Sequence, residues 1–208
     1  MLDNKSVIIG YGGHAYVVAE SYLLNGNSLN FYTELNEVSK NPLNIEYLGS
    51  ETDVNFKGLQ MNLSYILGIG NNALREKAAN YILSKSLRIL NVIDANSIIS
   101  ISVNIGIGVF ISKGVLINAF SNIGDFTILN TGCIIEHECQ IGRAAHIAPG
   151  AVLAGNVIIG ERSFIGANSV IKQGVKIGND VIIGAGSVIL NDIKDNQTVV
   201  GNPSRIIK

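Results

Sequence analysis

An isoleucine or leucine recurs at every sixth position through the second half of the chain, without one insertion or deletion. Neither the 3.6-residue period of a helix nor the two-residue period of a strand produces this step. A hexapeptide repeat is typical of a parallel β-helix, in which three hexads form one triangular coil and residues 18 apart stack. The repeated positions are Ile93, Ile99, Ile105, Ile111, Ile117, Ile123, Leu129, Ile135, Ile141, Ile147, Leu153, Ile159, Ile165, Ile171, Ile177, Ile183 and Ile189.

A second position in each hexad, two residues before the next repeated isoleucine, holds a small or β-branched side chain. Strand side chains alternate, so both positions are predicted to point into the prism. A narrow interior excludes aromatic and charged side chains, which agrees with 6% aromatic and 15% charged residues in the chain. Cys133 and Cys139 occupy the small position, so we expect buried, unreactive thiols and no disulfide.

The outward positions fall into three columns, two of them apolar. The first is Ile98, Leu116, Ile134, Val152, Val170 and Val188; the second is Phe110, Ile128, His146, Phe164 and Ile182; the third is Asn104, Asn122, Gln140, Ile158 and Lys176. A monomer rarely exposes apolar patches of this size. We therefore expect both apolar faces, and the compact corner of Thr131, Pro149, Ala167 and Ala185, to pack against neighbouring subunits around a three-fold axis. The corner of Asp125, Arg143, Glu161 and Asn179 is predicted to be a solvated edge.

The first 92 residues have a different pattern, in which short apolar runs alternate with helical segments. Strands are predicted at 6–9, 29–32, 65–69 and 88–92, with helices at 14–24 and 73–85. This alternation is typical of a parallel sheet. The predicted domains are an α/β domain at 1–92, a β-helix at 93–194 and a C-terminal cap at 195–208.

Charge and hydropathy exclude several classes of function. A net charge of −1 without a Lys/Arg cluster excludes a basic nucleic-acid-binding protein. The uncharged stretch 95–112 contains Asn, Ser and Gly, so no membrane span is predicted. Only two cysteines and no apolar signal core indicate a cytoplasmic protein.

The three histidines, His14, His137 and His146, have distinctive settings. His137 is predicted at a β-helix corner, stacked between Ala119 and Gly155, where open space would admit a ligand. Glu136 and Glu138 flank it, and a carboxylate beside an imidazole stabilises the imidazolium. The spacing alone leaves open which acid pairs with His137, and whether both are only solvated. For His146, interface packing and ligand contact both stay open.

The N-terminal segment Gly10-Tyr-Gly-Gly-His-Ala15 follows a predicted strand and opens a helix. Glycines there would let backbone N–H groups approach a phosphate, and Glu34 at the end of the second strand could bind a ribose hydroxyl. An ordinary tight turn is the alternative interpretation. No metal is predicted, because the repeat holds two histidines and no zinc-ligand spacing occurs.

Several segments together resemble the PglD/NeuD-type sugar acetyltransferases over essentially the whole chain. They are the Gly10–Ala15 turn, Leu67-Gly-Ile-Gly-Asn-Asn72 with Arg75, Ile135-Glu-His-Glu-Cys-Gln-Ile-Gly142 with His146, and Ala154-Gly-Asn-Val-Ile-Ile-Gly160. The resemblance implies a fold of mixed α/β class: a small Rossmann-like N-terminal domain followed by a left-handed parallel β-helix. It also implies a homotrimer with each active site between subunits.

The resemblance further implies the role of each site residue. His137 would be the general base, and Glu138 would raise its basicity. The residues implied to contact acetyl-CoA, the co-substrate, are His146, Gly155 through its backbone N–H, Ala167 and Ala185. Those implied to contact the nucleotide-linked sugar are Gly12, Gly13, His14, Glu34, Gly70, Asn71 and, near the amine, Asn130. The run Tyr32-Thr33-Glu34-Leu35 departs from the acidic pair common in the family, which leaves the base specificity open.

The function implied is transfer of acetyl from acetyl-CoA to the 4-amino group of a nucleotide-linked amino-deoxy sugar, with UDP as the expected nucleotide, for bacterial surface glycan synthesis. Attack is expected to be direct, without metal or acyl-enzyme, and with a backbone N–H stabilising the oxyanion. Two alternatives stay open. One is O-acetylation of a sialic-acid-like hydroxyl, and the other is a non-catalytic trimeric binding or scaffold protein.

Overall fold

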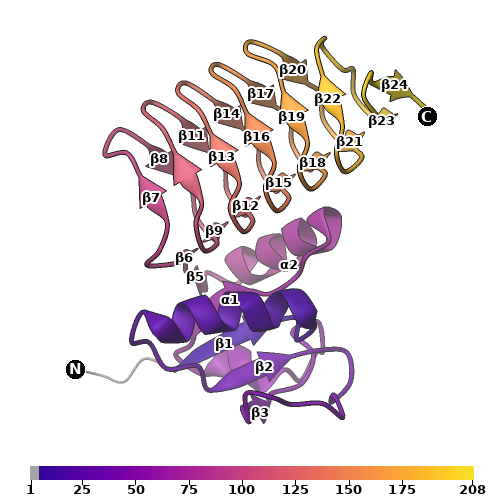
Figure 1. Cartoon of the computed structure of the whole chain (residues 1–208). Helices are drawn as coiled ribbons and strands as arrows, with labels where there is room; N and C mark the ends of the chain where they lie inside the picture. Colours follow the sequence, from indigo (N-terminus) through magenta and orange to yellow (C-terminus); the bar gives the residue numbers. More distant parts are fainter. Residues whose placement is uncertain (1–4) are drawn as a thin grey trace.

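The computed structural model describes residues 5–208, and residues 1–4 of the predicted first domain lie outside the described residues. An α/β domain lies against one side of a stack of short parallel strands (Figure 1). This confirms the predicted fold class, a Rossmann-like N-terminal domain followed by a left-handed β-helix. The domain limits at 92/93 and 194/195 stay predictions. None of the helices within residues 5–208 is both long and apolar enough to cross a bilayer.

The N-terminal sheet has the strand order β3-β2-β1-β4-β5, with every neighbouring pair parallel. Its strands are β1 (Ser6–Ile9), β2 (Phe31–Thr33), β3 (Glu46–Tyr47), β4 (Ser64–Leu67) and β5 (Arg88–Ile89). The helices are α1 (Gly13–Leu24), α2 (Asn72–Ser84) and the short 3₁₀ helix η1 (Lys57–Gln60). The sequence missed β3 and η1, which are too short to show a period.

Alternate residues of β1 pack against different helices, so the two helices cover opposite faces of the sheet. Ile8 belongs to one apolar cluster with Val18 of α1, whereas Val7 and Ile9 belong to another with Ile82 of α2. Both faces of a parallel sheet are normally covered in this way.

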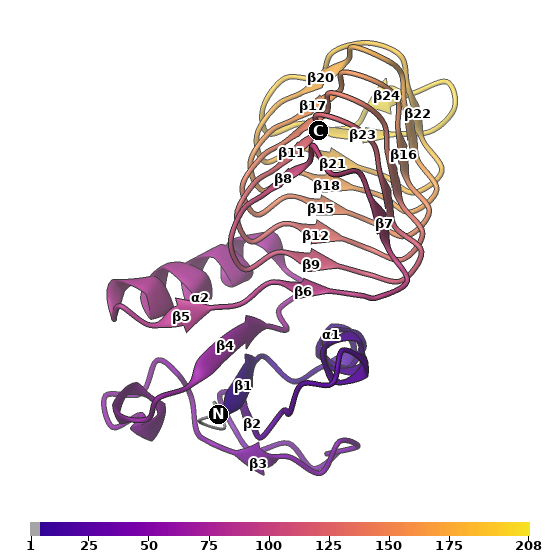
Figure 2. The same cartoon turned by 90° about the vertical axis from the view of Figure 1, so that its left-hand side faces the viewer.

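The β-helix has three faces, which we call the docked face, the apolar face and the amide face (Figure 2). The docked face, which lies against the N-terminal domain, contains β6 (Val92–Ile93), β9 (Phe110–Ile111), β12 (Ile128–Leu129), β15 (His146–Ile147), β18 (Phe164–Ile165), β21 (Ile182–Ile183), β23 (Thr198–Val200) and the antiparallel β24 (Arg205–Ile206). The apolar face contains β7 (Ile98–Ile99), β10 (Leu116–Ile117), β13 (Ile134–Ile135), β16 (Val152–Leu153), β19 (Val170–Ile171) and β22 (Val188–Ile189). The amide face contains β8 (Asn104–Ile105), β11 (Asn122–Ile123), β14 (Gln140–Ile141), β17 (Ile158–Ile159) and β20 (Lys176–Ile177).

The interior of the prism follows the hexapeptide pattern. The repeated isoleucines pair in register 18 residues apart, as Ile117 with Ile135 and Ile135 with Leu153. Both predicted inward positions are buried in one continuous core. Cys133 and Cys139 are free and buried, which confirms their predicted burial, and burial raises the pKa of the two thiols to about 12 and about 11.

The docked face differs from the prediction that both apolar columns pack against neighbouring subunits. Its outward side chains Phe110 and Ile128 are 3% and 1% exposed, because they pack into the apolar cluster of α1 rather than against a neighbouring subunit. His146 is 8% exposed on the same face. The prediction that both apolar faces contact neighbours is therefore wrong for this part of the docked face. On the apolar face, by contrast, Ile98 remains 69% exposed.

The corner predicted to be a solvated edge also differs from expectation, because α2 lies along it. Arg143 bonds Glu76 of α2 through Nε at 2.9 Å and Asp125 of the preceding coil through Nη1 at 3.1 Å. Arg162 also contacts Glu76, at 3.3 Å. These charges therefore join the two domains instead of facing only water.

Candidate active site

The glycine loops of the N-terminal domain lie at the carboxyl ends of adjacent strands. The turn Gly10–Gly13 follows β1, and the loop from Gly68 to Asn71 follows β4, which pairs with β1. Ligands of open α/β sheets bind at this edge, where helix N-termini also point. The Gly68–Asn71 loop lies beside the first turn of α1, since a Cβ added to Gly70 would lie 3.6 Å from His14 Cβ.

Glu34 and Asn71 already bind backbone within these loops. The Glu34 carboxylate accepts a hydrogen bond from the Tyr11 N–H at 2.7 Å and so steadies the glycine turn. The Asn71 side chain caps α2 by accepting from the Leu74 N–H at 3.0 Å. Gly12 and Gly13 are exposed, and a Cβ added to either would meet nothing within 4 Å. The structure therefore brings the predicted nucleotide-sugar residues of this domain to one edge.

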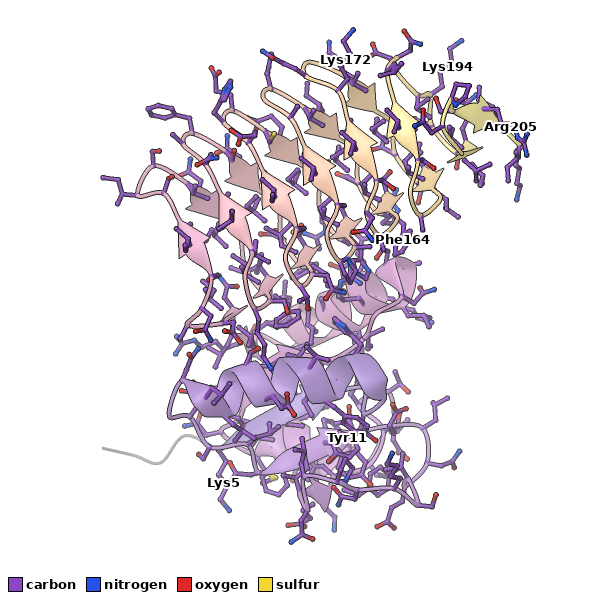
Figure 3. The ribbon with its side chains drawn as sticks, in the orientation of Figure 1. Lys5, Tyr11, Phe164, Lys172, Lys194 and Arg205 are labelled. Carbon is purple, nitrogen blue, oxygen red and sulfur yellow. The ribbon has the colours of Figure 1, made fainter. Side chains whose placement is uncertain are left out.

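His146 lies on the docked face and completes this cluster from the β-helix side. Its ring centroid is 6.2 Å from that of His14 and 5.0 Å from that of Phe164 (Figure 3 labels Phe164, on the side facing the N-terminal domain). The Asn130 amide nitrogen lies 3.1 Å from His146 Nε2, while Asn130 Oδ1 accepts from the Thr131 N–H. An amide N–H donor requires an acceptor at Nε2, so this pair selects the tautomer protonated at Nδ1.

Burial and the nearby Arg75 charge keep both histidines of the cluster neutral. Burial is the larger cause, and it lowers the pKa of His14 to about 4 and that of His146 to about 3. His14 Nε2 is buried without a hydrogen-bond partner in the described structure, whereas a hydrogen bond to the Gly70 backbone partly opposes the lowering of the pKa of His146. Both rings are therefore buried in their neutral form.

These depressed pKa values predict a loss of stability in mild acid. Between about pH 6.5, where an unfolded histidine titrates, and about pH 4, the unfolded chain binds the additional protons, so the free energy of unfolding falls as pH falls. Each histidine contributes a slope of up to about 1.4 kcal/mol per pH unit. Denaturant unfolding of His146→Gln over this range should show a shallower slope than wild type. Equal slopes would contradict the neutral assignment.

His137 and Glu138 form a hydrogen-bonded pair at the corner between the apolar and amide faces. His137 Nδ1 lies 3.0 Å from Glu138 Oε2, and the two side chains are 50% and 62% exposed. Glu138 adopts a left-handed backbone conformation, with φ of 61°, which breaks strand alternation and lets adjacent side chains meet. The contact selects Glu138 over Glu136, the choice that spacing left open.

Gly155, one coil further on, provides the space that the His137 ring occupies. A Cβ added to Gly155 would collide with His137 Nε2 and Cε1. The Gly155 backbone is not in the left-handed region, so another residue could adopt its conformation. The His137 ring requires glycine here because any side chain would occupy the space of the ring.

Adding that one methyl group should therefore displace the ring without unfolding the protein. Gly155→Ala is expected to lower kcat by roughly tenfold to a hundredfold, the scale of a small misplacement of a reacting group. The melting temperature should stay within about 3 °C of wild type, since the half-exposed ring can swing into solvent. Unchanged kcat in a folded variant would show that this ring position is unimportant.

The predicted site residues do not come together within one chain. His137, Glu138 and Gly155 lie at the corner opposite the docked face, whereas His14 and His146 lie at the docked face. Ala167 and Ala185 lie at the third location, the corner between the docked and apolar faces. Among the described residues, no three His, Cys, Asp or Glu side chains gather to hold a metal ion.

One buried residue of this region had no role assigned from the sequence. From the sequence, Arg75 of α2 is identified only as part of the segment that resembles the family. In the structure this side chain is 1% exposed and donates hydrogen bonds to both domains. Its partners are the Asn72 side chain and five main-chain carbonyls, and carbonyls carry no sequence signal.

A Rossmann-like domain joined to a hexapeptide β-helix with an exposed His–Glu pair defines the class of left-handed β-helix acyltransferases. The PglD N-terminal domain family matches residues 5–82, and the bacterial transferase hexapeptide family matches residues 156–191. The chain belongs to the PglD/NeuD-type sugar acetyltransferases. This confirms the predicted family and the enzyme class, a CoA-dependent sugar acetyltransferase.

Solved structures support the assignment over the whole length. The chain is 35% identical to a mutant of GDP-perosamine N-acetyltransferase from Caulobacter crescentus in complex with CoA and GDP-perosamine, covering 99% of this chain and 97% of that one, with a TM-score of 0.94. It is 30% identical to the acetyltransferase domain of PglB from Neisseria gonorrhoeae in complex with acetyl coenzyme A, covering 98% and 99%, with a TM-score of 0.91. A comparison with curated protein sequences gives no match.

Proposed function

We propose that the protein transfers acetyl from acetyl-CoA to the 4-amino group of a nucleotide-linked amino-deoxy sugar. The observation that carries this is the His137–Glu138 pair, whose Nε2 edge lies over the side-chain-free Gly155. A general base needs a ring nitrogen that can take the proton of the substrate amine, and the contact of Glu138 with Nδ1 leaves Nε2 of this half-exposed ring for that role. The relatives described with CoA and GDP-perosamine, and with acetyl coenzyme A, support the two substrate classes.

In the proposed reaction, the neutral sugar amine attacks the thioester carbonyl. His137 Nε2 takes the amine proton as the C–N bond forms, while Glu138 at Nδ1 stabilises the resulting imidazolium. The Gly155 N–H is proposed to stabilise the oxyanion. The intermediate then collapses with cleavage of the C–S bond, and the CoA thiolate leaves. This scheme uses neither Cys133 nor Cys139, both buried.

The separation of the two residue groups supports a site shared between subunits. His137 faces away from its own nucleotide-binding loops, and the exposed column of the apolar face offers a surface for a neighbour. In a trimer, His137 and Gly155 of one subunit would act on a nucleotide-linked sugar held by Gly12, Gly13, His14, Glu34, Gly70 and Asn71 of another. The proposed acetyl-CoA contacts remain His146, Gly155, Ala167 and Ala185, and Asn130 is proposed to lie near the amine.

A thiol-release assay over a panel of acceptors tests the proposal. UDP is the nucleotide expected from the sequence, and GDP is the one in the Caulobacter complex, so UDP-, GDP- and dTDP-linked 4-amino sugars are each compared with the matching 4-hydroxyl sugar. We expect thiol release with an amino sugar only. Release with a hydroxyl sugar, including a sialic acid, would support O-acetylation. No release with any acceptor would favour a non-catalytic binding protein.

A further inference from the structure

Arg75 is the largest side chain that the fold buries almost completely, at 1% exposure. It lies on the first turn of α2, directly after the loop that carries Gly70 and Asn71. Burial lowers the pKa of Arg75 to about 9, the cost of removing its charge from water. A cost of this kind is tolerated only where hydrogen bonds compensate for it.

The guanidinium reaches carbonyl groups of both domains. Towards the loop, Nη1 donates to the Ile69 and Gly70 carbonyls at 3.2 and 3.0 Å. Towards the β-helix, Nε donates to the Phe126 carbonyl at 2.7 Å, and Nη2 to the Ala144 and Ala145 carbonyls at 2.7 and 3.2 Å.

These contacts need the arginine fork and not merely a positive charge. A lysine ammonium is one point donor, whereas the planar guanidinium presents five N–H groups in fixed directions. Here Nη1 donates to the loop and Nε to the β-helix, while Nη2 donates both to the β-helix and to the Asn72 side chain at the start of α2. The side chain therefore fixes the distance between two segments that are about 70 residues apart in sequence.

Both segments lead directly to residues of the candidate site. Gly70 abuts His14, and the Ala145 carbonyl belongs to the residue before His146. The Arg75 charge also acts on both imidazoles, whose centroids are 6.2 Å apart.

We infer that Arg75 is a positioning residue that holds the Gly70 loop against His146, the first residue of β15. It thereby fixes the positions of His14, Gly70 and His146 relative to one another for ligand binding. This rests on the proposed function in assigning nucleotide-sugar binding to that loop. Loss of the fork should leave the loop free to move away from His146, which weakens nucleotide binding without removing any residue that touches the ligand.

Arg143 provides a matched control on the same domain boundary. It joins α2 to the β-helix through Glu76 and Asn80 and lies over the Phe126 ring, 4.2 Å from its centroid. Its guanidinium, however, donates to none of the carbonyls that Arg75 binds. Removing either arginine should lower the melting temperature, whereas only Arg75 should alter the site.

The test compares wild type with Arg75→Lys, Arg75→Met and Arg143→Met as full-length protein. Calorimetry measures binding of UDP, GDP and dTDP, and nitrogen-15 NMR of the ligand-free protein reports the tautomers of His14 and His146. We expect Arg75→Lys to bind the preferred nucleotide at least about tenfold more weakly and to shift the His146 ring signals. Arg143→Met should keep affinity within about twofold and leave the ring signals unchanged.

Equal nucleotide affinity in Arg75→Lys and Arg143→Met, or unchanged ring signals in both Arg75 variants, would overturn the inference. If Arg75→Met does not fold, the nucleotide affinity and ring signals of Arg75→Lys, which keeps the charge, test the inference. If wild type binds none of UDP, GDP and dTDP, the nucleotide assignment of the proposed function fails. The ring signals then still decide whether Arg75 sets the geometry of His146.

Discussion

Replacing His137 with alanine is expected to lower kcat by at least about a hundredfold, the usual scale for loss of a general base. The side chain is half-exposed at a β-helix corner, so its removal should leave the fold intact. Steady-state kinetics with acetyl-CoA and the accepted amino sugar measure the effect, with circular dichroism as the check on folding. A folded variant within threefold of wild type would exclude the base role.

The two neighbouring acids offer a matched pair of controls for this prediction. Glu138 contacts His137 Nδ1 at 3.0 Å, and Glu136 flanks the histidine on its other side. Glu138→Gln should lower kcat by at least about tenfold and change the pH dependence of kcat, because the imidazolium loses its carboxylate. Glu136→Gln should stay within about threefold. Equal effects of the two changes would contradict the assigned pair.

The second large effect is expected from one charge placed on the apolar face. Leu116 is 36% exposed in the column that also exposes Ile98 and Val170. Leu116→Asp would bury an unpaired carboxylate in any contact with a neighbour, at a cost of several kcal/mol. We expect sedimentation to show a trimer for wild type and a monomer for the variant, with kcat/KM at least about a hundredfold lower.

Asn122→Asp is the control for added charge, because Asn122 lies on the amide face in the same coil as Leu116. There the side chain bonds the amides of Asn104 and Gln140 along an open surface. Asn122→Asp should remain trimeric and active. A wild-type protein that is monomeric and fully active would refute the shared site.

The hexapeptide repeat was sufficient to predict the β-helix and its interior because each inward position is a local choice between small and branched apolar side chains. The outward columns were less informative. Phe110 and Ile98 are equally apolar, yet the first packs on the chain's own α1 cluster and the second stays exposed. An apolar column predicts that a face is covered but does not identify the segment that covers it.

The candidate site was predictable where side chains carry the chemistry and not where backbone does. His137 stood out through the stacked Ala119 and Gly155, but pairing with Glu138 depends on its left-handed backbone, which spacing does not reveal. The role of Arg75 depends on carbonyl groups, which every residue possesses.

The central claim is amide formation on a nucleotide-linked amino sugar, and the most direct test is mass spectrometry of the reaction product. The protein is incubated with acetyl-CoA and each UDP-, GDP- or dTDP-linked 4-amino sugar, and the product is then treated with mild hydroxylamine. The predicted result is a gain of one acetyl group that survives this treatment, because amides resist hydroxylamine while esters are cleaved. A product that loses its acetyl group, or no acetylated product with any amino sugar, would contradict the claim.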